Sequence, residues 1–123
     1  MQGSILIVDD EQAIRDSLLL VLEEEGYRCT AVENGHEALQ LARQGTFDLL
    51  ITDLIMPRMK GNELIKNVSQ LSPDMPIIIL TSYSNARIAS NIRDCCNTTN
   101  LFKPIDFDEL IHQIRNLIGQ PSN

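Results

Sequence analysis

Short runs of Ile, Val and Leu alternate along this chain with longer segments in which apolar residues recur every three or four positions. The runs are typical of buried β-strands and the longer segments of amphipathic α-helices, so the pattern predicts repeated βα units. Such units build a parallel sheet that is covered by helices on both faces. We expect strands at residues 4–8, 28–32, 47–52, 77–80 and about 100–102, and helices at about 11–25, 34–43, 64–71, 84–93 and 106–118.

The ends of several predicted helices carry their own signals. Asn34 and Asp106 are each followed three residues later by Glu, which is the spacing of an N-terminal capping pair. Gly26 follows the first predicted helix, and a glycine there ends a helix because it adopts the left-handed conformation without strain.

Length and charge limit the classes of function. A chain of 123 residues suits one domain, and we expect a single domain over 1–123 with a core of about 4–119 and with 120–123 as a tail or the cut end of a longer chain. Seventeen acidic against ten basic residues give a formal charge of −7, which disfavours direct binding to nucleic acid or to an anionic membrane. No apolar run approaches the roughly 20 residues of a membrane span. The three cysteines lack metal-binding spacing, which favours reduced thiols and a cytoplasmic location.

Polar side chains follow the predicted strands at the points where the strands end. Asp9 and Asp10 follow the first strand, Asp53 the third, Thr81 the fourth and Lys103 the fifth. In a doubly wound sheet, ligands bind beyond the carboxyl ends of the strands, at the point where the strand order reverses. If the order is 2-1-3-4-5, the three aspartates converge there, with Thr81 and Lys103 closing one side.

Three carboxylates in one crevice repel one another, so such a cluster persists where a cation or a function compensates it. A hard divalent ion such as Mg²⁺ suits carboxylate oxygens, and Asp10 and Asp53 would supply them. Lys103 adds a positive charge and Thr81 a hydroxyl donor, which together describe a pocket for a phosphoryl group. An aspartate can itself be the nucleophile in such a site, forming an acyl phosphate.

Four stretches of the sequence together resemble the receiver domain of two-component response regulators, a flavodoxin-like (βα)5 fold. Four motifs in the family's order and at its spacing are far more specific than one acidic pair after a strand. The resemblance covers almost the whole chain, from about residue 4 to 119. The stretches are ILIVDDE at 5–11, FDLLITDLIMPRMKG at 47–61, PIIILTS at 76–82 and LFKPID at 101–106.

The resemblance implies a role for each acidic residue of the crevice. Asp53 would be the phosphoacceptor. Asp10, Asp53 and the backbone carbonyl of Ile55 would bind Mg²⁺ directly, and Asp9 would act through a metal-bound water. The domain would then be a signalling switch that catalyses only its own phosphorylation and dephosphorylation, and would have no external substrate.

The resemblance also implies partners. Lys103 and Thr81 would contact the phosphoryl oxygens, and the phosphoryl donor would be a histidine kinase or a histidine phosphotransfer protein. Output would run through the face formed by the fourth helix, fifth strand and fifth helix, about residues 84–118, toward an effector domain or a second copy. This chain departs from the family at Asn100, where the family usually has the Tyr or Phe that changes rotamer with the threonine.

Three alternatives can be compared with this interpretation. A Mg²⁺-dependent phosphohydrolase usually has a second Asp two positions after the nucleophile, where this chain has Ile55. A flavodoxin-like FMN carrier needs a first loop that cradles phosphate, and Asp9-Asp10-Glu11 is electrostatically its opposite. A receiver-like domain that binds partners without being phosphorylated stays open because of Asn100.

Overall fold

The computed structural model describes residues 3–54, 61–82 and 97–121, and these residues form an α/β domain around one parallel sheet. The sheet has five strands in the order β2-β1-β3-β4-β5, which confirms the predicted doubly wound topology. Every neighbouring pair of strands is parallel. The strands are β1 (Ser4–Val8), β2 (Arg28–Val32), β3 (Leu49–Asp53), β4 (Ile77–Thr81) and β5 (Thr98–Phe102).

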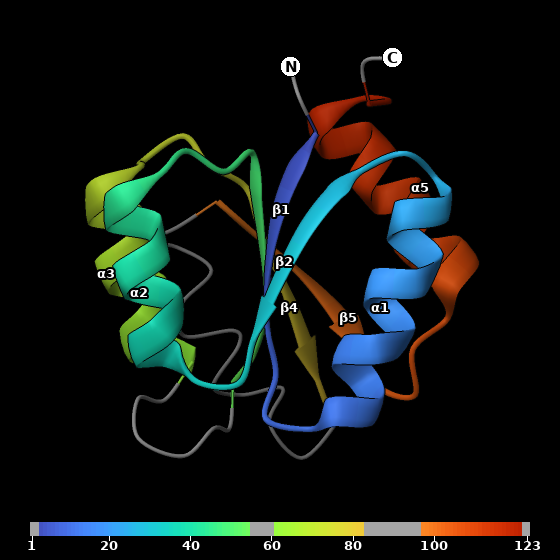
Figure 1. The fold of residues 1–123 in the computed structure, drawn as a ribbon, viewed down its shortest axis with the longest axis horizontal. Coiled ribbons are helices and arrows are strands. Elements are labelled where there is room, and N and C mark those ends of the chain that lie inside the picture. The colour runs from blue at the N-terminus through green and yellow to red at the C-terminus, as the bar shows by residue number, and fades with distance from the viewer. Residues whose placement is uncertain (1–2, 55–60, 83–96, 122–123) are drawn as a thin grey trace.

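Helices cover both faces of the sheet (Figure 1). Helices α1 and α5 lie on one face, and α2 and α3 lie on the other. The helix expected at residues 84–93 lies outside the described residues. No helix in the described part of the chain is long and apolar enough to cross a membrane. The helices are α1 (Gln12–Glu24), α2 (Gly35–Gln44), α3 (Gly61–Leu71) and α5 (Phe107–Ile118).

The central strands are buried on both faces, as the unbroken apolar runs predict. All five residues of β3 and all five of β4 are buried. Side chains of β1 alternate between two hydrophobic clusters because successive strand residues point to opposite faces. Ile5 and Ile7 pack in the cluster beneath α1 and α5, whereas Leu6 and Val8 pack in the cluster beneath α2 and α3.

The predicted helix ends are confirmed by their hydrogen bonds. The Asn34 side chain accepts a hydrogen bond from the Glu37 N–H at 3.0 Å. The Asp106 side chain accepts from the N–H groups of Asp108 and Glu109, at 3.1 and 3.2 Å. Gly26 follows α1 with φ of 98°, the left-handed conformation that its position after the helix predicts.

Strand boundaries differ from the sequence prediction at four places. Strand β3 begins at Leu49, two residues later than the predicted start at residue 47. Strand β5 begins at Thr98, about two residues earlier than expected, because Thr98 pairs with Ile77 of β4. Asp53 and Thr81 are the last residues of β3 and β4 rather than the first residues of the loops, and they pair with Leu80 and Phe102. The strand ladders therefore hold the backbone of both polar residues.

The first and last described residues, Gly3 and Pro121, lie close together at the end of the sheet opposite the carboxyl ends of the strands (Figure 1). The buried Tyr27 donates a hydrogen bond from its hydroxyl to the carbonyl oxygen of Gly119 at 2.7 Å. Pro121 packs so closely on Gly3 and Gly26 that a Cβ atom at either glycine would lie within 3.1 Å of the proline ring. This contact ties the end of α5 to the starts of β1 and β2.

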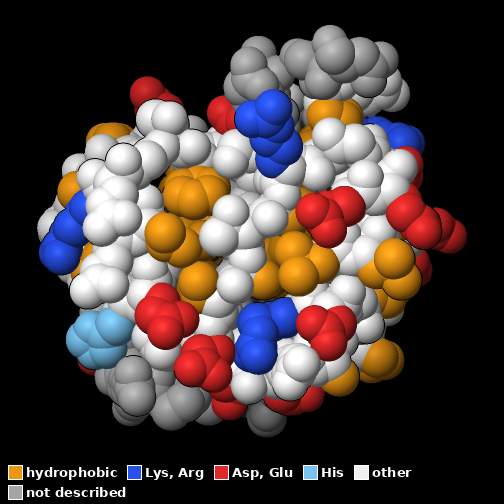
Figure 2. Space-filling view, in the orientation of Figure 1, with side chains coloured by type: hydrophobic (Ala, Val, Ile, Leu, Met, Phe, Trp, Pro, Cys, Tyr) orange, Lys and Arg blue, Asp and Glu red, His pale blue; other side chains and the backbone are white. Residues whose placement is uncertain are grey.

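The edge strand β2 runs across the face that Figures 1 and 2 present. Hydrophobic side chains lie in the spaces beside this strand, and several acidic side chains lie toward the carboxyl ends of the strands, at the bottom of the view (Figure 2). The predicted acidic site belongs to that end of the molecule.

Candidate functional site

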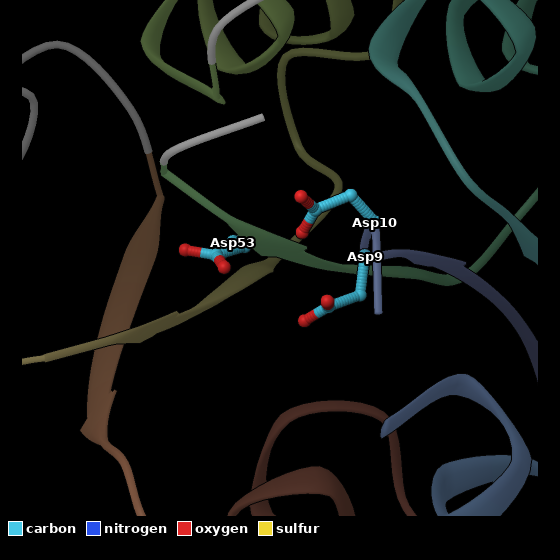
Figure 3. Close-up of side chains that lie close together, drawn as sticks. All are labelled: Asp9, Asp10 and Asp53. Carbon is cyan, nitrogen blue, oxygen red and sulfur yellow. The ribbon is translucent and has the colours of Figure 1, made fainter. Parts of the chain in front are cut away.

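Three aspartates converge at the carboxyl edge of the sheet, as their positions at the ends of two predicted strands indicate: Asp9 and Asp10 follow β1, and Asp53 is the last residue of β3. Strand β1 pairs directly with β3, with Val8 opposite Thr52, so the residues that follow these two lie side by side. Asp9, Asp10 and Asp53 each offer a carboxylate oxygen, and these oxygens all lie within 4.8 Å of one another. Figure 3 shows the three carboxylates around a shared space.

The three carboxylates differ in burial. Asp9 and Asp53 are 1% and 8% exposed, whereas Asp10 is exposed to solvent. Asp9 Oδ1 accepts a hydrogen bond from the Glu11 N–H at 2.9 Å, and Asp53 Oδ1 accepts from the Leu54 N–H at 2.6 Å. Burial raises the pKa of the Asp9 carboxyl above its ordinary value, against the Glu11 hydrogen bond and the charge of Lys103, which lower it.

Lys103 provides the positive charge that the crevice was predicted to contain. Its Nζ lies 2.9 Å from Asp53 Oδ2 and 3.4 Å from Asp9 Oδ2, so one ammonium bridges the two buried carboxylates. Burial lowers the pKa of this ammonium, but the hydrogen bond to Asp53 and the charges of both aspartates outweigh that effect and raise the pKa overall. Lys103 therefore carries its charge where the carboxylates converge.

The backbone around Lys103 is anchored to the neighbouring strand. The Lys103 N–H donates to the Thr81 carbonyl oxygen at 2.8 Å, which continues the ladder between β4 and β5. The peptide bond between Lys103 and Pro104 is cis. Thr81 is fully buried, and its hydroxyl donates to the Ser82 carbonyl oxygen at 3.2 Å. The Thr81 hydroxyl would have to exchange that bond to reach a phosphoryl group.

The acidic cluster fits a hard divalent cation. Carboxylates are acceptors only, and three of them at this separation need a positive charge to offset their repulsion. Asp10 is the most accessible of the three, and Asp9 and Asp53 are held in place by backbone N–H groups. The predicted carbonyl ligand, Ile55, lies outside the described residues.

One contact at the site was not predicted from the sequence. The Arg15 guanidinium Nη1 donates to the carbonyl oxygen of Asp9 at 2.7 Å. The sequence does contain a signal for it, an arginine on the first turn of the helix that follows the acidic pair. The signal is weak, because an arginine there is equally typical of a solvated helix surface.

Asn100, the residue at which the chain departs from the resemblance, lies in β5 opposite Ile79. Its Oδ1 atom is buried, as is the Oγ1 atom of Thr98, and neither atom has a hydrogen-bond partner in the described part of the chain. The two residues are separated by one position, so they lie on the same face of β5. This face of the strand is therefore polar, and its hydrogen-bonding groups are only partly paired. Each unpaired buried oxygen lowers the free energy of unfolding by roughly 1–3 kcal/mol.

Comparison with known proteins gives consistent matches. The sequence model of the family described as response regulator receiver domain matches residues 5–115. The chain is 31% identical over 123 residues to sporulation initiation phosphotransferase F of Bacillus subtilis strain 168, covering 100% of this chain and 99% of that protein. It is 35% identical over 118 residues to the DNA-binding transcriptional regulator NtrC of Escherichia coli K12, covering 96% of this chain.

The relatives differ in how much of their length the chain matches. The chain spans 25% of the length of NtrC but 99% of the length of sporulation initiation phosphotransferase F. Among solved structures, the response regulator TrrA of Thermotoga maritima, in complex with Mg²⁺-BeF, superposes with a TM-score of 0.84 at 37% identity. That match covers 94% of this chain and 98% of the TrrA chain.

Proposed function

Because this chain belongs to the response regulator receiver family, we propose that it is a signalling switch that accepts a phosphoryl group on Asp53. The observation that carries this proposal is the Lys103 ammonium, which bridges Asp53 and Asp9 beside the exposed Asp10. The site unites a nucleophilic carboxylate, a fixed positive charge and an acidic cation site. We place a single receiver domain across the chain, with a core of about residues 4–119.

The Asp53 carboxylate is the nucleophile of the proposed reaction. One of its oxygens attacks the phosphorus of a phosphohistidine, so that an O–P bond forms while the N–P bond of the donor breaks. The imidazole nitrogen keeps the electron pair of the broken bond and takes a proton from solvent. The product is an acyl phosphate on Asp53.

Lys103 and Thr81 stabilise the transferred group. The Lys103 ammonium already contacts Asp53 Oδ2, so a short movement brings it to a phosphoryl oxygen. Thr81 ends the adjacent strand, and its hydroxyl would exchange the Ser82 carbonyl for another phosphoryl oxygen. Both donors then act on charge that moves onto the phosphoryl oxygens during transfer.

Asp10, Asp53 and the backbone carbonyl of Ile55 would hold Mg²⁺, with Asp9 acting through a water. Bound Mg²⁺ would neutralise the carboxylates and the charge that develops on the phosphoryl oxygens. The oxygens of the three aspartates, within 4.8 Å of one another, support this assignment. The structure of the relative TrrA is a complex with Mg²⁺-BeF, which also supports it.

The proposed donor is a histidine kinase or a histidine phosphotransfer protein. A pocket of about 270 Å³ supports docking of such a donor, because its mostly apolar walls include Lys103, whose Nζ lies 2.9 Å from Asp53 Oδ2. The formal charge of −7 argues against direct contact of this domain with nucleic acid or membrane, and we expect a cytoplasmic location. The pocket is lined by Ile14, Ser17, Lys103, Pro104, Ile105 and Phe107.

Phosphorylation would change the partners of the face formed by residues 84–118. The added charge biases a conformational equilibrium, and the partner would be an effector domain or a second copy of the chain. Asn100 and Thr98 belong to this face, and each has a buried oxygen without a partner among the described residues. Asn100 stands at the position where the family usually has an aromatic ring. We therefore expect the change at β5 to involve hydrogen bonds rather than an aromatic rotamer.

Intact-mass measurement after incubation with a small-molecule acyl phosphate tests the proposal. The wild-type protein should gain one phosphoryl group only when Mg²⁺ is present, and Asp53→Asn should gain none. The exposed Asp74, before β4 at the opposite end of the sheet, provides the control Asp74→Asn, which should behave like the wild type. If the wild-type protein binds Mg²⁺ and still gains no mass, the alternative of a phosphorylation-independent partner-binding domain replaces the proposal.

A further inference from the structure

The turn between β1 and α1, residues 9–11, carries two of the three carboxylates and belongs to neither element. Its contacts with the rest of the domain therefore decide where the carboxylates point. The Asp9 N–H donates to the Val32 carbonyl oxygen of β2 at 3.2 Å, and Asp9 Oδ1 accepts from the Glu11 N–H at 2.9 Å. A further anchor is the bond of 2.7 Å from Arg15 Nη1 to the Asp9 carbonyl oxygen.

The Asp9 carbonyl is part of the peptide unit that joins Asp9 to Asp10. A peptide unit is planar, so a bond to its oxygen fixes the orientation of the whole unit. The Asp10 side chain is exposed, so packing does not set its direction and the backbone must. The bond from Arg15 therefore sets the direction in which Asp10 leaves the turn.

The choice of a main-chain acceptor has a chemical consequence. Lys103 contacts carboxylate oxygens of Asp9 and Asp53, and a cation would compete with it for those oxygens. The Arg15 bond instead restrains the turn through a main-chain oxygen, so it takes up no carboxylate oxygen. The backbone of Arg15 is itself held by helix α1, because the Arg15 N–H donates a hydrogen bond to the Glu11 carbonyl oxygen at 3.1 Å.

We propose that Arg15 is a positioning residue for the cation of this site: its guanidinium holds the Asp9–Asp10 peptide so that both carboxylates face Asp53. The inference rests on the proposed function, in which that cation is Mg²⁺. Loss of the guanidinium frees the turn and weakens Mg²⁺ binding, although it also removes a positive charge. If Arg15 acted only through its charge, the change in Mg²⁺ affinity would be the reverse. The guanidinium would repel Mg²⁺, and removal of the guanidinium would tighten Mg²⁺ binding.

Calorimetric titration of the metal-free protein with Mg²⁺ distinguishes the two roles, because a positioning role predicts weaker Mg²⁺ binding in the variant and a purely electrostatic role predicts tighter binding. The variants are Arg15→Met, which removes both the donor and the charge, and Arg15→Lys, which keeps the charge but loses the planar fork. The control is Arg28→Met, because Arg28 is exposed at the start of β2, far from the turn. We expect the Mg²⁺ Kd to rise about tenfold in Arg15→Met, the loss of one charge-assisted hydrogen bond, and to change by less than about twofold in Arg28→Met.

A second measurement uses the phosphorylation reaction. In a Mg²⁺ titration with an acyl phosphate donor, the half-saturating Mg²⁺ concentration should rise in Arg15→Met by the same factor as the Kd. The rate at saturating Mg²⁺ should stay close to the wild-type rate, because Arg15 acts on the cation site and not on the phosphoryl group.

An Arg15→Met protein that is folded by circular dichroism and binds Mg²⁺ as tightly as wild type, or more tightly, would overturn the inference. If Arg15→Met does not fold, Arg15→Lys decides by the same criterion, with weaker Mg²⁺ binding expected. A wild-type protein that binds no Mg²⁺ would overturn the metal assignment of the proposed function as well. Unchanged binding in a folded Arg15 variant, beside a wild type that binds Mg²⁺, overturns the inference on Arg15 alone.

Discussion

Replacing Lys103 by Met should destabilise the metal-free protein and increase the stabilisation that added Mg²⁺ provides. The Lys103 ammonium lies 2.9 Å from Asp53 and 3.4 Å from Asp9, whose side chains are 11% and 1% exposed. Removing one partner of a fully buried ion pair costs about 3–5 kcal/mol, because an uncompensated charge remains. The Lys103 side chain is 21% exposed, so solvent screens part of the interaction and we expect about 2 kcal/mol.

Magnesium should offset this loss. A ligand that binds only the folded state stabilises it by about 2.7 kcal/mol at a concentration of 100 times its Kd. In Lys103→Met the cation no longer competes with an ammonium for the oxygens of Asp9 and Asp53. A given Mg²⁺ concentration should therefore raise the free energy of unfolding more in the variant than in the wild type.

Urea unfolding followed by far-ultraviolet circular dichroism, with and without Mg²⁺, measures both effects. In thermal unfolding followed by the same signal, a loss of about 2 kcal/mol corresponds to a fall in Tm of roughly 6–10 °C for a domain of this size. Lys66→Met, at an exposed position of α3, is the matched control and should leave stability and the Mg²⁺ response unchanged. The reasoning is refuted if Lys103→Met is as stable as the wild type without Mg²⁺, or if Mg²⁺ stabilises both proteins equally.

Three further predictions concern the scaffold. Tyr27→Phe should lower the free energy of unfolding by about 1 kcal/mol, because the Gly119 carbonyl loses its donor; an unchanged urea midpoint would contradict this. Asn34→Ala should cost about 1 kcal/mol by leaving the Glu37 N–H without its cap, and Asn34→Ser should recover most of that loss in the same assay. Burial raises the pKa of the Cys29 thiol to about 12, so, with the other two cysteines replaced by serine, alkylation should be slow at neutral pH and accelerate toward pH 12. The raised pKa also favours folding below the ordinary thiol value of 9.0, and this contribution should be lost as the pH rises toward about 12.

The elements of the fold could be predicted because their signals are local. The apolar run of β4 is buried along its whole length, and the capping residues Asn34 and Asp106 lie where their spacing to Glu places them. The start of β5 was predicted about two residues too late, because Thr98 and Thr99 are polar and do not extend the apolar run. Their place in the strand comes from pairing with Ile77 and Ile78 of β4, which the pattern within β5 does not contain.

The sequence alone was enough to predict which residues meet at the carboxyl edge. A parallel sheet brings the carboxyl ends of its strands to one side, and Asp9, Asp10, Asp53 and Lys103 each come directly after an apolar run. How the charges of these groups interact depends on the folded arrangement of the chain. The Lys103 ammonium donates hydrogen bonds to two aspartates that lie 50 and 94 positions away in the sequence. Burial raises the pKa of the Asp9 carboxyl. Burial and Coulomb energy depend on distances between residues from different elements, and no local pattern of the sequence encodes those distances.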